Sequence, residues 1–392
     1  MKIQPDIKLD FDDVIIIPKR TTLESRKQVK LEKIFYFYHS PRQLTCVPVM
    51  CANMAFCGPK LAKKLSENGM CAALNKYLTI EEIHSICNTS ARIFMSIGLN
   101  EQEKLKSYIN KYGYAPNLVI DVPNAYMDKF VKYCAEIRSI SPESVIIAGN
   151  VVTPEMVQEL IIYGKVDCVK IGIGPGSHCE TKRVTGVGYQ QISAAMECSI
   201  VAHGLKNGDK KLGLICLDGG FKHIGDLAKG FVAGADFTMS GSLFCGVDEG
   251  DGEWIYEKTI DPFADWEVVD LTRQQIESES FRSFILNMNS QINIPHNQYE
   301  SPYLKFQNIT KTDRKTKFKH YGLSSHYAQE KHGTGKKDYR ASEGKVSLID
   351  AKGPVDDVVQ EILGGLRSTG TYINAHELRD FNKCGEFIRV SR

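Results

Sequence analysis

The sequence has no segment suited to crossing a membrane and no excess of charge suited to nucleic acid. None of its apolar runs approaches the length that spans a bilayer, and residues 1–10 are polar, without the apolar core of a signal segment. The 49 Lys and Arg residues nearly balance the 47 Asp and Glu residues, giving a formal net charge of +2, and no basic cluster stands out. We therefore expect neither a membrane nor a nucleic acid as a partner.

The twelve Cys residues lack the spacings that would mark a disulfide scaffold or a zinc site. They are spread thinly over 392 residues, with no CxxC pair and no His at zinc-ligand spacing. Reduced thiols are typical of the cytoplasm, so we expect a cytoplasmic protein. That compartment suits an enzyme whose nucleophile is a thiolate.

What the sequence does have is an alternation of short apolar runs with stretches of helical spacing. The runs predict buried strands at 46–51, 71–74, 93–97, 118–122, 145–148, 168–173, 212–217 and 237–239. Helical spacing lies between them, for example at 60–66, 79–86, 155–162 and 225–231. Thr79 followed by Glu82 is a capping box, and Pro154 suits a first helical turn. Eight β/α units in about two hundred residues predict a (β/α)8 TIM barrel of the α/β class.

Polar or glycine residues follow each predicted strand. In chain order they are Asn53, Asn75 with Lys76, Gly98, Asp121 with Asn124, Gly149 with Asn150, a glycine loop, 218–220 and 241–242. The carboxyl ends of barrel strands carry the active site, so these residues are candidates for it. The seventh and eighth loops of a barrel often hold a phosphate, although either glycine site alone is more often a tight turn.

The β/α pattern stops after Gly246. Residues 247–313 are too long for an ordinary connection and predict an inserted lobe or a partly disordered segment, with one helix at 271–288. The pattern resumes near Tyr321, residues 331–337 suggest a mobile lid, and a helix at 355–366 closes the fold. We thus expect one catalytic barrel, formed by 1–246 and 314–392, with a C-terminal flap and an unusual insertion after strand 8.

The glycine loop after the sixth predicted strand is the best candidate for the chemistry. Three glycines and a proline fall within 172–176, so bare backbone groups can approach a ligand closely. Cys179 follows, two residues before the hydroxyl of Thr181 and close to Lys182 and Arg183, a setting that favours the thiolate. A buried structural thiol is the alternative interpretation.

The sequence resembles the IMP dehydrogenase/GMP reductase family in motifs that run nearly from end to end outside the insertion. They lie at 9–14 with 18–20, 148–153, 172–177 with Cys179 and Thr181, 185–189, 218–220, 225–229, 321–325, 340–345 and 362–369. The amino-acid sequences of the motifs at 185–189 and 339–345 are similar to those of the GMP reductase branch. IMP dehydrogenases usually carry a regulatory CBS pair after the second strand, whereas here Lys76 passes directly into a predicted helix.

The resemblance implies NADPH-dependent reductive deamination of GMP to IMP and ammonia through a thioimidate on Cys179. Thr181 and Glu343 match the residues that supply the proton for ammonia, and Lys76 matches a further catalytic position. An IMP-dehydrogenase-like oxidation of IMP with NAD is one alternative. A catalytically silent regulator that binds purine nucleotides is another, although keeping Cys179, Thr181 and Glu343 together argues against it.

The resemblance also implies the binding residues. For the nucleotide they are Asp218 at the ribose, Gly219, Gly220, Gly241 and Ser242 at the phosphate, and Ser324, Arg340, Ser342 and Gly344 around the base and ribose. For NADPH they are Ser25, Arg26, Lys76, Asp121, Val122, Pro123, Ser368, Thr369, Gly370 and Thr371. Backbone carbonyls of Gly174, Gly176 and Cys179 correspond to a K⁺ site. The family supplies the group at 368–371 from a neighbouring subunit, which implies a homotetramer.

Several positions depart from the family pattern, namely Ala55, Phe56, Asn75, His178, Glu180 and Gly370. At Ala55 and Phe56 the family has a carboxylate and a hydroxyl, and their loss motivates the silent-regulator alternative. His178, beside Cys179, could lower the pKa of the thiol, but we expect it to be solvated, as loop His residues usually are.

Overall fold

The computed structural model describes residues 3–260, 267–268, 304–305, 311–332 and 341–390. The chain divides into two compact units, Met1–Trp254 with Lys317–Arg392 and, separately, Ile255–Thr316. The helix predicted at 271–288 and most of the lid predicted at 331–337 lie outside the described residues. No helix in the described part of the chain is long and apolar enough to cross a membrane.

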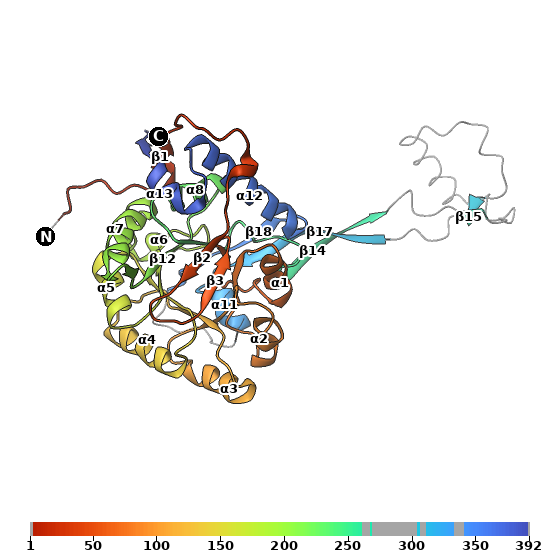
Figure 1. Ribbon diagram of the computed structural model, residues 1–392. Coiled ribbons are helices and arrows are strands. Elements are labelled where there is room, and N and C mark those ends of the chain that lie inside the picture. Colours follow the sequence, from red (N-terminus) through yellow and green to blue (C-terminus); the bar gives the residue numbers. More distant parts are fainter. Residues whose placement is uncertain (1–2, 261–266, 269–303, 306–310, 333–340, 391–392) are drawn as a thin grey trace. The chain divides into compact units, whose positions relative to one another are not determined.

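A closed barrel of eight parallel strands forms the centre of the larger unit (Figure 1). Its strands are β4 (Val49–Cys51), β5 (Cys71–Ala73), β6 (Ile93–Ile97), β7 (Asn117–Asp121), β8 (Ile146–Val151), β9 (Cys168–Ile171), β12 (Leu214–Asp218) and β13 (Phe237–Ser240). Each falls on a predicted apolar run, and β13 closes the ring by pairing with β4. The predicted TIM barrel is therefore confirmed.

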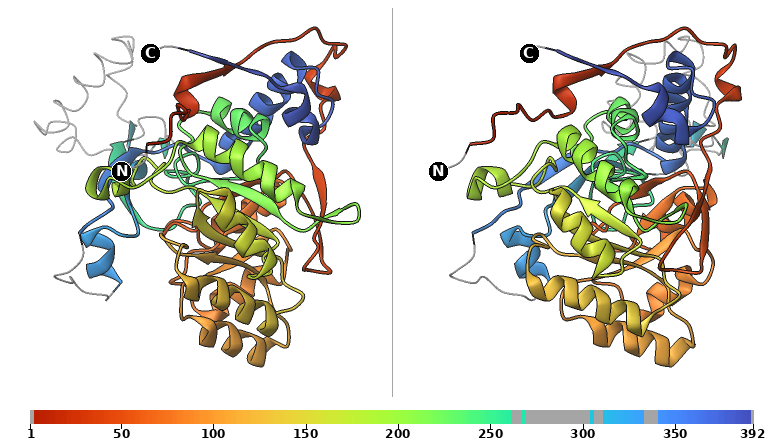
Figure 2. Two further views of the ribbon diagram at one scale, coloured as in Figure 1. Left: turned by 90° about the vertical axis from the view of Figure 1, so that its left-hand side faces the viewer. Right: turned by 60° about the vertical axis from the view of Figure 1, so that its left-hand side comes forward.

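Helices follow the strands and form the outside of the barrel, as Figures 1 and 2 show. They are α1 (Pro59–Glu67), α2 (Ile80–Cys87), α3 (Gln102–Tyr112), α4 (Asp128–Ile140), α5 (Pro154–Ile162), α7 (Gln191–Gly204) and α8 (Ile224–Val232). The short helix α6 (Thr181–Thr185) has no buried residue and lies in the connection between β9 and α7. The predicted starts are confirmed: Thr79 and Glu82 cap α2 reciprocally, and Pro154 occupies the first turn of α5.

A β-hairpin that the sequence pattern did not reveal plugs the amino-terminal end of the barrel. Its strands are β2 (Lys33–Tyr36) and β3 (Gln43–Cys46), and Figure 1 shows them across the middle of the ring. Phe35 and Leu44 join the side chains inside the barrel in one cluster, and the Phe35 ring lies 4.3 Å from that of Phe237. The apolar run at 46–51 is thus two strands, β3 and β4, with Pro48 between them.

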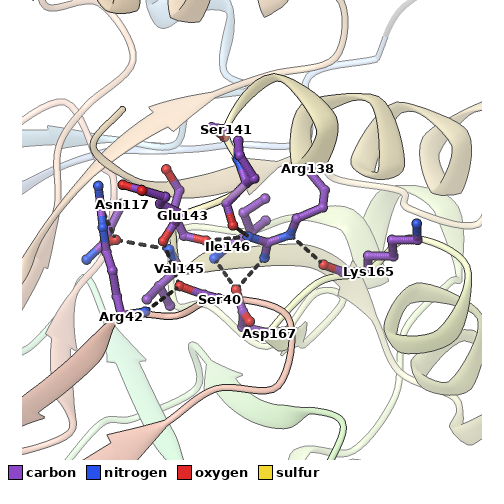
Figure 3. Close-up of polar contacts among 12 residues, drawn as sticks. Ser40, Arg42, Asn117, Arg138, Ser141, Glu143, Val145, Ile146, Lys165 and Asp167 are labelled. Atoms are coloured by element: carbon purple, nitrogen blue, oxygen red, sulfur yellow. Dashed lines mark hydrogen bonds and ion pairs between the residues drawn. The ribbon is translucent and has the colours of Figure 1, made fainter. Parts of the chain in front are cut away.

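A buried ion pair also holds this amino-terminal end, as Figure 3 shows. The Arg138 guanidinium lies 2.5 Å from the Asp167 carboxylate, and both side chains are buried. Asp167 also accepts the backbone N–H of Ile146 at 2.8 Å, and Arg138 donates to the carbonyls of Lys165 and Ser144. Because these bonds join α4 to the starts of β8 and β9, they fix the strand ends opposite the active face.

Further elements surround the barrel. They are β1 (Val14–Ile16) paired with β19 (Phe387–Arg389), the hairpin β10 (Lys206–Asn207) and β11 (Lys210–Lys211), α11 (His326–Lys331), β18 (Val346–Asp350), α12 (Val355–Tyr372) and α13 (Phe381–Cys384). The smaller unit contains β15 (Glu267–Val268), paired with β16 (Leu304–Lys305), and the strands β14 (Glu253–Ile260) and β17 (Lys311–Tyr321) each have residues in both units. The closing helix α12 is longer than the predicted 355–366 and packs against α8 and α1. Lys317–Tyr321 pair with β18, and we call residues 317–332 and 341–350 the flap.

Candidate active site

A cavity of about 280 Å³ opens at the carboxyl ends of the barrel strands. Its lining includes Asn150, the loop 172–179, Thr181, 218–222, Gly241, Ser242, 322–324 and Glu343. Most of these residues follow strands β8, β9, β12 and β13, whereas 322–324 and Glu343 come from the flap. The structure therefore brings the predicted nucleophile, acid and phosphate-site glycines to one cavity.

The loop that carries Cys179 can form only because glycines occupy its tight positions. Gly172 has φ +148°, and a Cβ there would lie 2.4 Å from the carbonyl oxygen of Asp218. After the loop turns, the Cys179 N–H donates to the Gly176 carbonyl at 3.0 Å, and α6 begins at Thr181. The Cys179 side chain is half-buried, whereas ten of the other eleven Cys residues are buried.

The thiol, a hydroxyl and a carboxylate form a continuous hydrogen-bonded chain. Cys179 Sγ lies 3.2 Å from Thr181 Oγ1, and Thr181 Oγ1 donates to Glu343 Oε2 at 2.6 Å. Because the Thr181 proton is directed to the carboxylate, its oxygen can accept the proton of the thiol. We call these three residues the proton relay; their arrangement can carry a proton between the sulfur and Glu343.

Backbone pairing between the loop and the flap brings Glu343 into the proton relay, although it is 162 positions from Thr181. Cys179 and Gly344 form an antiparallel bridge, and the Glu180 N–H donates to the Glu343 carbonyl at 2.7 Å. A Cβ on Gly344 would lie 3.0 Å from the Ser325 nitrogen and 3.1 Å from the Gly322 Cα. The flap can approach the loop this closely because Gly344 has no side chain.

His178 is not the solvated side chain that we expected. Its Nε2 lies 2.5 Å from Ser347 Oγ on β18, its Nδ1 lies 3.0 Å from Ser177 Oγ, and its ring is 4.2 Å from that of His320. Burial, and to a smaller extent the charge of Lys345, lower the pKa of His178. The imidazole thus serves as a second, side-chain link between the loop and the flap.

Asp218, which we expect to bind the ribose, lies at the end of β12 in the cavity wall. Its Oδ2 accepts from Lys170 Nζ at 2.7 Å and from Asn150 Nδ2 at 2.9 Å. Gly219 and Gly220 follow with φ +81° and +86°, which only glycine adopts readily, and they expose bare backbone to the cavity. Gly241 and Ser242, at the end of β13, lie in the same wall.

The residues expected on the cofactor side fall into two groups. Asp121, at the end of β7, accepts from Lys170 Nζ at 2.5 Å and from Asn53 Nδ2 at 3.0 Å, and the nearby Pro123 reaches the cavity. Burial opposes its charge, but the Lys170 ammonium outweighs this and lowers the pKa of Asp121. Val122 is buried, and the Lys76 carbonyl accepts from Lys104 Nζ at 2.7 Å.

The second group lies elsewhere on the larger unit. Ser25 caps the 3-10 helix Arg26–Gln28, which packs against α12, the helix that carries 368–371. A Cβ on Gly370 would lie 2.7 Å from Val29 Cγ1, so this helix and segment meet closely. Neither Ser25 and Arg26 nor the α12 residues are among those that line the cavity, so the structure brings them to each other and not to Cys179.

The remaining predicted residues differ in where they lie. Ser324 lines the cavity, and Ser342, which does not, accepts the His326 N–H and donates to the Gly344 carbonyl. Arg340 lies outside the described residues. Within the described part of the chain, no cluster of three or more His, Cys, Asp and Glu side chains could hold a metal ion. The K⁺ site, which would use backbone carbonyls, stays a prediction.

Sequence reasoning gave no role to Lys170 and Gln191, and it named Asn53 as a candidate without a partner. Lys170 was included in a predicted strand, and the signal that could have identified it is a charged residue inside an otherwise apolar run. The fully buried Gln191 donates to the carbonyls of Asp218 and Gly219 and thereby holds the turn after β12 in place. Nothing local in the sequence distinguishes a glutamine at the start of a helix as such a support.

Comparison with known proteins assigns the chain to a family. A family model described as "IMP dehydrogenase / GMP reductase domain" matches residues 8–261. A GMP reductase of Vibrio vulnificus (strain YJ016) and one of Aeromonas salmonicida (strain A449) are each 38% identical over 398 aligned residues, covering 100% of this chain and 97% of the relative. GMP reductase 1 of Homo sapiens is 36% identical with the same coverage. The chain therefore belongs to the IMP dehydrogenase/GMP reductase family, whose enzymes act on purine nucleotides with a nicotinamide cofactor.

Proposed function

We propose that the protein is a GMP reductase, an oxidoreductase that converts GMP and NADPH to IMP, ammonia and NADP⁺. The observation that carries the proposal is the proton relay of Cys179, Thr181 and Glu343 at the wall of the barrel cavity. Similarity to GMP reductases over the whole chain supports the same activity and favours it over IMP oxidation or a silent regulator.

The proton relay fits the first half of this reaction. Cys179 Sγ bonds to C2 of the guanine while the bond from C2 to the amino nitrogen breaks, leaving a thioimidate between purine and enzyme. The thiol proton passes by way of Thr181 and Glu343 to the leaving nitrogen, which departs as ammonia. Two easier steps thus replace one difficult substitution.

The second half of the reaction frees the sulfur. NADPH, when bound, supplies the hydride that takes the place of the sulfur at C2. Cys179 then leaves as a thiolate and takes up a proton from solvent by way of Glu343 and Thr181, so that IMP forms and the enzyme returns to its starting state. The half-buried position of Cys179 lets the sulfur reach a ligand while Glu343 stays connected to it.

The walls of the cavity suit a nucleotide. Asp218 offers a carboxylate to the ribose hydroxyls. The backbone N–H groups of Gly220, Gly241 and Ser242 are suited to the phosphate, whereas the Gly219 N–H donates to the Met239 carbonyl, so Gly219 would contribute to the phosphate site by close approach of its bare backbone. Ser324 and Gly344 lie on the flap side, where the base would be, with Ser342 and Arg340 beside them in sequence. These assignments follow the family resemblance.

For the cofactor, the fit is best at Asp121, Val122, Pro123 and Lys76, which lie near the barrel mouth. Ser25 and Arg26 pack with 368–371 at a distance from the cavity wall, which is consistent with a cofactor end bound where two subunits meet, and we propose a homotetramer. The carbonyls of Gly174, Gly176 and Cys179 would hold K⁺; Gly176 accepts one hydrogen bond and keeps a second lone pair for a cation.

We also propose that residues 1–246 and 314–392 form the catalytic domain, with 247–313 inserted in it, and that the protein acts in the cytoplasm. All twelve Cys residues are free thiols, which fits a reducing compartment.

The test is a pair of assays on the purified protein. GMP with NADPH should lower the absorbance of reduced nicotinamide and release one ammonia per NADPH consumed. IMP with NAD⁺ should give no sustained increase in that absorbance. Oxidation of IMP without any reduction of GMP would contradict the proposal, and so would GMP binding without turnover under either condition.

A further inference from the structure

One buried cation connects the two carboxylates that the proposed reaction assigns to different ligands. Lys170 on β9 is 2% exposed, and its Nζ lies 2.5 Å from Asp121 Oδ1 and 2.7 Å from Asp218 Oδ2. Asp121 ends β7 and Asp218 ends β12, so the ammonium spans the inside of the barrel between them. The side chains of Asp121 and Asp218 are 25% and 17% exposed, respectively, and form the solvent-facing side of the cluster.

Strand register explains why the three side chains meet. Lys170 lies opposite Gly149 of β8 and Cys216 of β12, and Gly149 lies opposite Asp121 of β7. A Cβ at Gly149 would lie 2.3 Å from the Lys170 carbonyl oxygen and 2.7 Å from its Cβ, so the glycine is what allows β8 to approach this closely. The position of Lys170 therefore follows from the barrel itself and not from a flexible loop.

Each carboxylate is held at more than one point. Asn53 Nδ2 donates to the other oxygen of Asp121 at 3.0 Å, and Asn150 Nδ2 donates to Asp218 Oδ2 at 2.9 Å. Lys170 and Asn150 both use Oδ2 of Asp218, and a ribose hydroxyl can donate to Oδ1. A displacement of either carboxylate must therefore move the ammonium, and with it the other carboxylate.

The electrostatics point the same way. Burial opposes the charge of Lys170, but the two carboxylates outweigh it and raise the pKa of the ammonium. Two negative charges then share one positive charge, so a change at one carboxylate alters how strongly the ammonium holds the other. A lysine that served only the packing of the barrel would not need to connect two ligand-facing groups.

We propose that Lys170 is a positioning residue that couples the nucleotide site at Asp218 to the nicotinamide cofactor site at Asp121. The inference rests on the proposed function for the identity of the two ligands. Binding of the nucleotide fixes Asp218 and, through Lys170, Asp121, so that the cofactor meets a carboxylate already in place. Thermodynamic reciprocity requires the cofactor to favour the nucleotide by the same factor.

The experiment measures this coupling by calorimetry on the full-length protein, using GMP and NADP⁺, a pair that cannot react. We expect saturating NADP⁺ to lower the Kd of GMP at least about fivefold in the wild type, within the range typical of coupled sites. In Lys170→Met, saturating NADP⁺ should change the Kd of GMP by less than about twofold. In Lys170→Arg, which keeps a cation, NADP⁺ should still lower the Kd of GMP at least about threefold.

The matched control is Lys33→Met, which removes another lysine from an ion pair with a buried aspartate. Lys33 lies 3.5 Å from Asp236 at the opposite end of the barrel, so its loss should leave the coupling at the wild-type value. If Lys170→Met retained the wild-type coupling, the proposal would be overturned. If NADP⁺ left the Kd of GMP unchanged in the wild type, the proposal would be overturned too, even if Lys170→Met did not fold.

The wild-type assay with GMP and NADPH separates this inference from the proposed function. Turnover together with uncoupled binding would refute only the role of Lys170. Absence of turnover with any purine nucleotide would refute the function, whereas the coupling between the two ligands would still be measurable.

Discussion

The direction of single hydrogen bonds sets the chemistry of this site. Thr181 donates to Glu343 and so presents its oxygen, rather than its proton, to Cys179. The sequence predicted the nucleophile from its loop, because glycines and cations around a cysteine are a local pattern. Glu343 was assigned only through the family resemblance, since a carboxylate beside Lys345 has no local feature that connects it to a cysteine 164 positions earlier.

Replacing the sulfur should separate chemistry from binding. We expect Cys179→Ala to abolish turnover and to leave GMP affinity within about tenfold, because the groups proposed for the ribose and phosphate are untouched. Steady-state rates and calorimetry measure the two effects. Cys384→Ala, which changes the other half-buried thiol, is the control and should keep full activity. Full activity in Cys179→Ala would refute the thioimidate mechanism.

The carboxylate at the end of the proton relay should matter for rate rather than affinity. Glu343→Gln keeps the shape but cannot accept the proton, so we expect kcat to fall roughly hundredfold to ten-thousandfold with KM for GMP nearly unchanged. Glu180→Gln is the control, because Glu180 is a carboxylate adjacent to Cys179 in sequence that pairs with Arg183 and not with Thr181. If kcat fell equally in both variants, Glu343 would act only through its negative charge near Cys179 and not by accepting a proton.

At the scale of elements, the strands of the barrel were predicted well from the sequence, whereas the hairpin β2–β3 and the flap strand β18 were not. Barrel strands are buried on both faces and appear as apolar runs, so β6 was predicted to the residue. The hairpin β2–β3 and the flap strand β18 have alternating or exposed side chains, which are hard to distinguish from a loop. The docking of the flap onto the Cys179 loop depends on backbone bonds, which leave no pattern in side chains.

Two glycines test the importance of that docking. Gly344→Ala places a Cβ 3.0 Å from the Ser325 nitrogen, so we expect the flap to shift and kcat to fall roughly tenfold to hundredfold. Gly364→Ala lies in α12, where a Cβ meets nothing within 4 Å. That variant should keep its activity and gain roughly 0.5–1 kcal/mol in the free energy of unfolding. Initial rates and denaturant titrations measure both, and unchanged kcat in Gly344→Ala would argue against docking as the step that completes the site.

At the scale of the whole molecule, the two ends of the barrel have separate tasks. The carboxyl end holds the candidate site, whereas Arg138 and Asp167 hold strands and helix together at the amino end. The barrel and its eight units were predictable because the pattern repeats, but the network at the amino end was not, since its partners are mostly backbone carbonyls.

Breaking that network should cost stability and spare catalysis. Arg138→Met leaves the Asp167 carboxylate buried without its cation, so we expect a loss of about 3–5 kcal/mol in the free energy of unfolding. Values of KM and kcat for the folded protein should stay within about twofold of the wild type. Lys106→Met, which removes an exposed ion pair with Glu103, should change stability by less than about 1 kcal/mol. A large change in KM for GMP in Arg138→Met would show that the two ends are not independent.

The β2–β3 hairpin, which closes the amino-terminal end of the barrel, has a consequence for how substrate enters and products leave. Because Phe35 and Leu44 fill the amino-terminal end of the barrel, we expect GMP to enter and the products to leave at the carboxyl end, where the cavity opens. The proposed order of steps then requires ammonia to leave past the purine, which stays bonded to Cys179 until the hydride has been transferred.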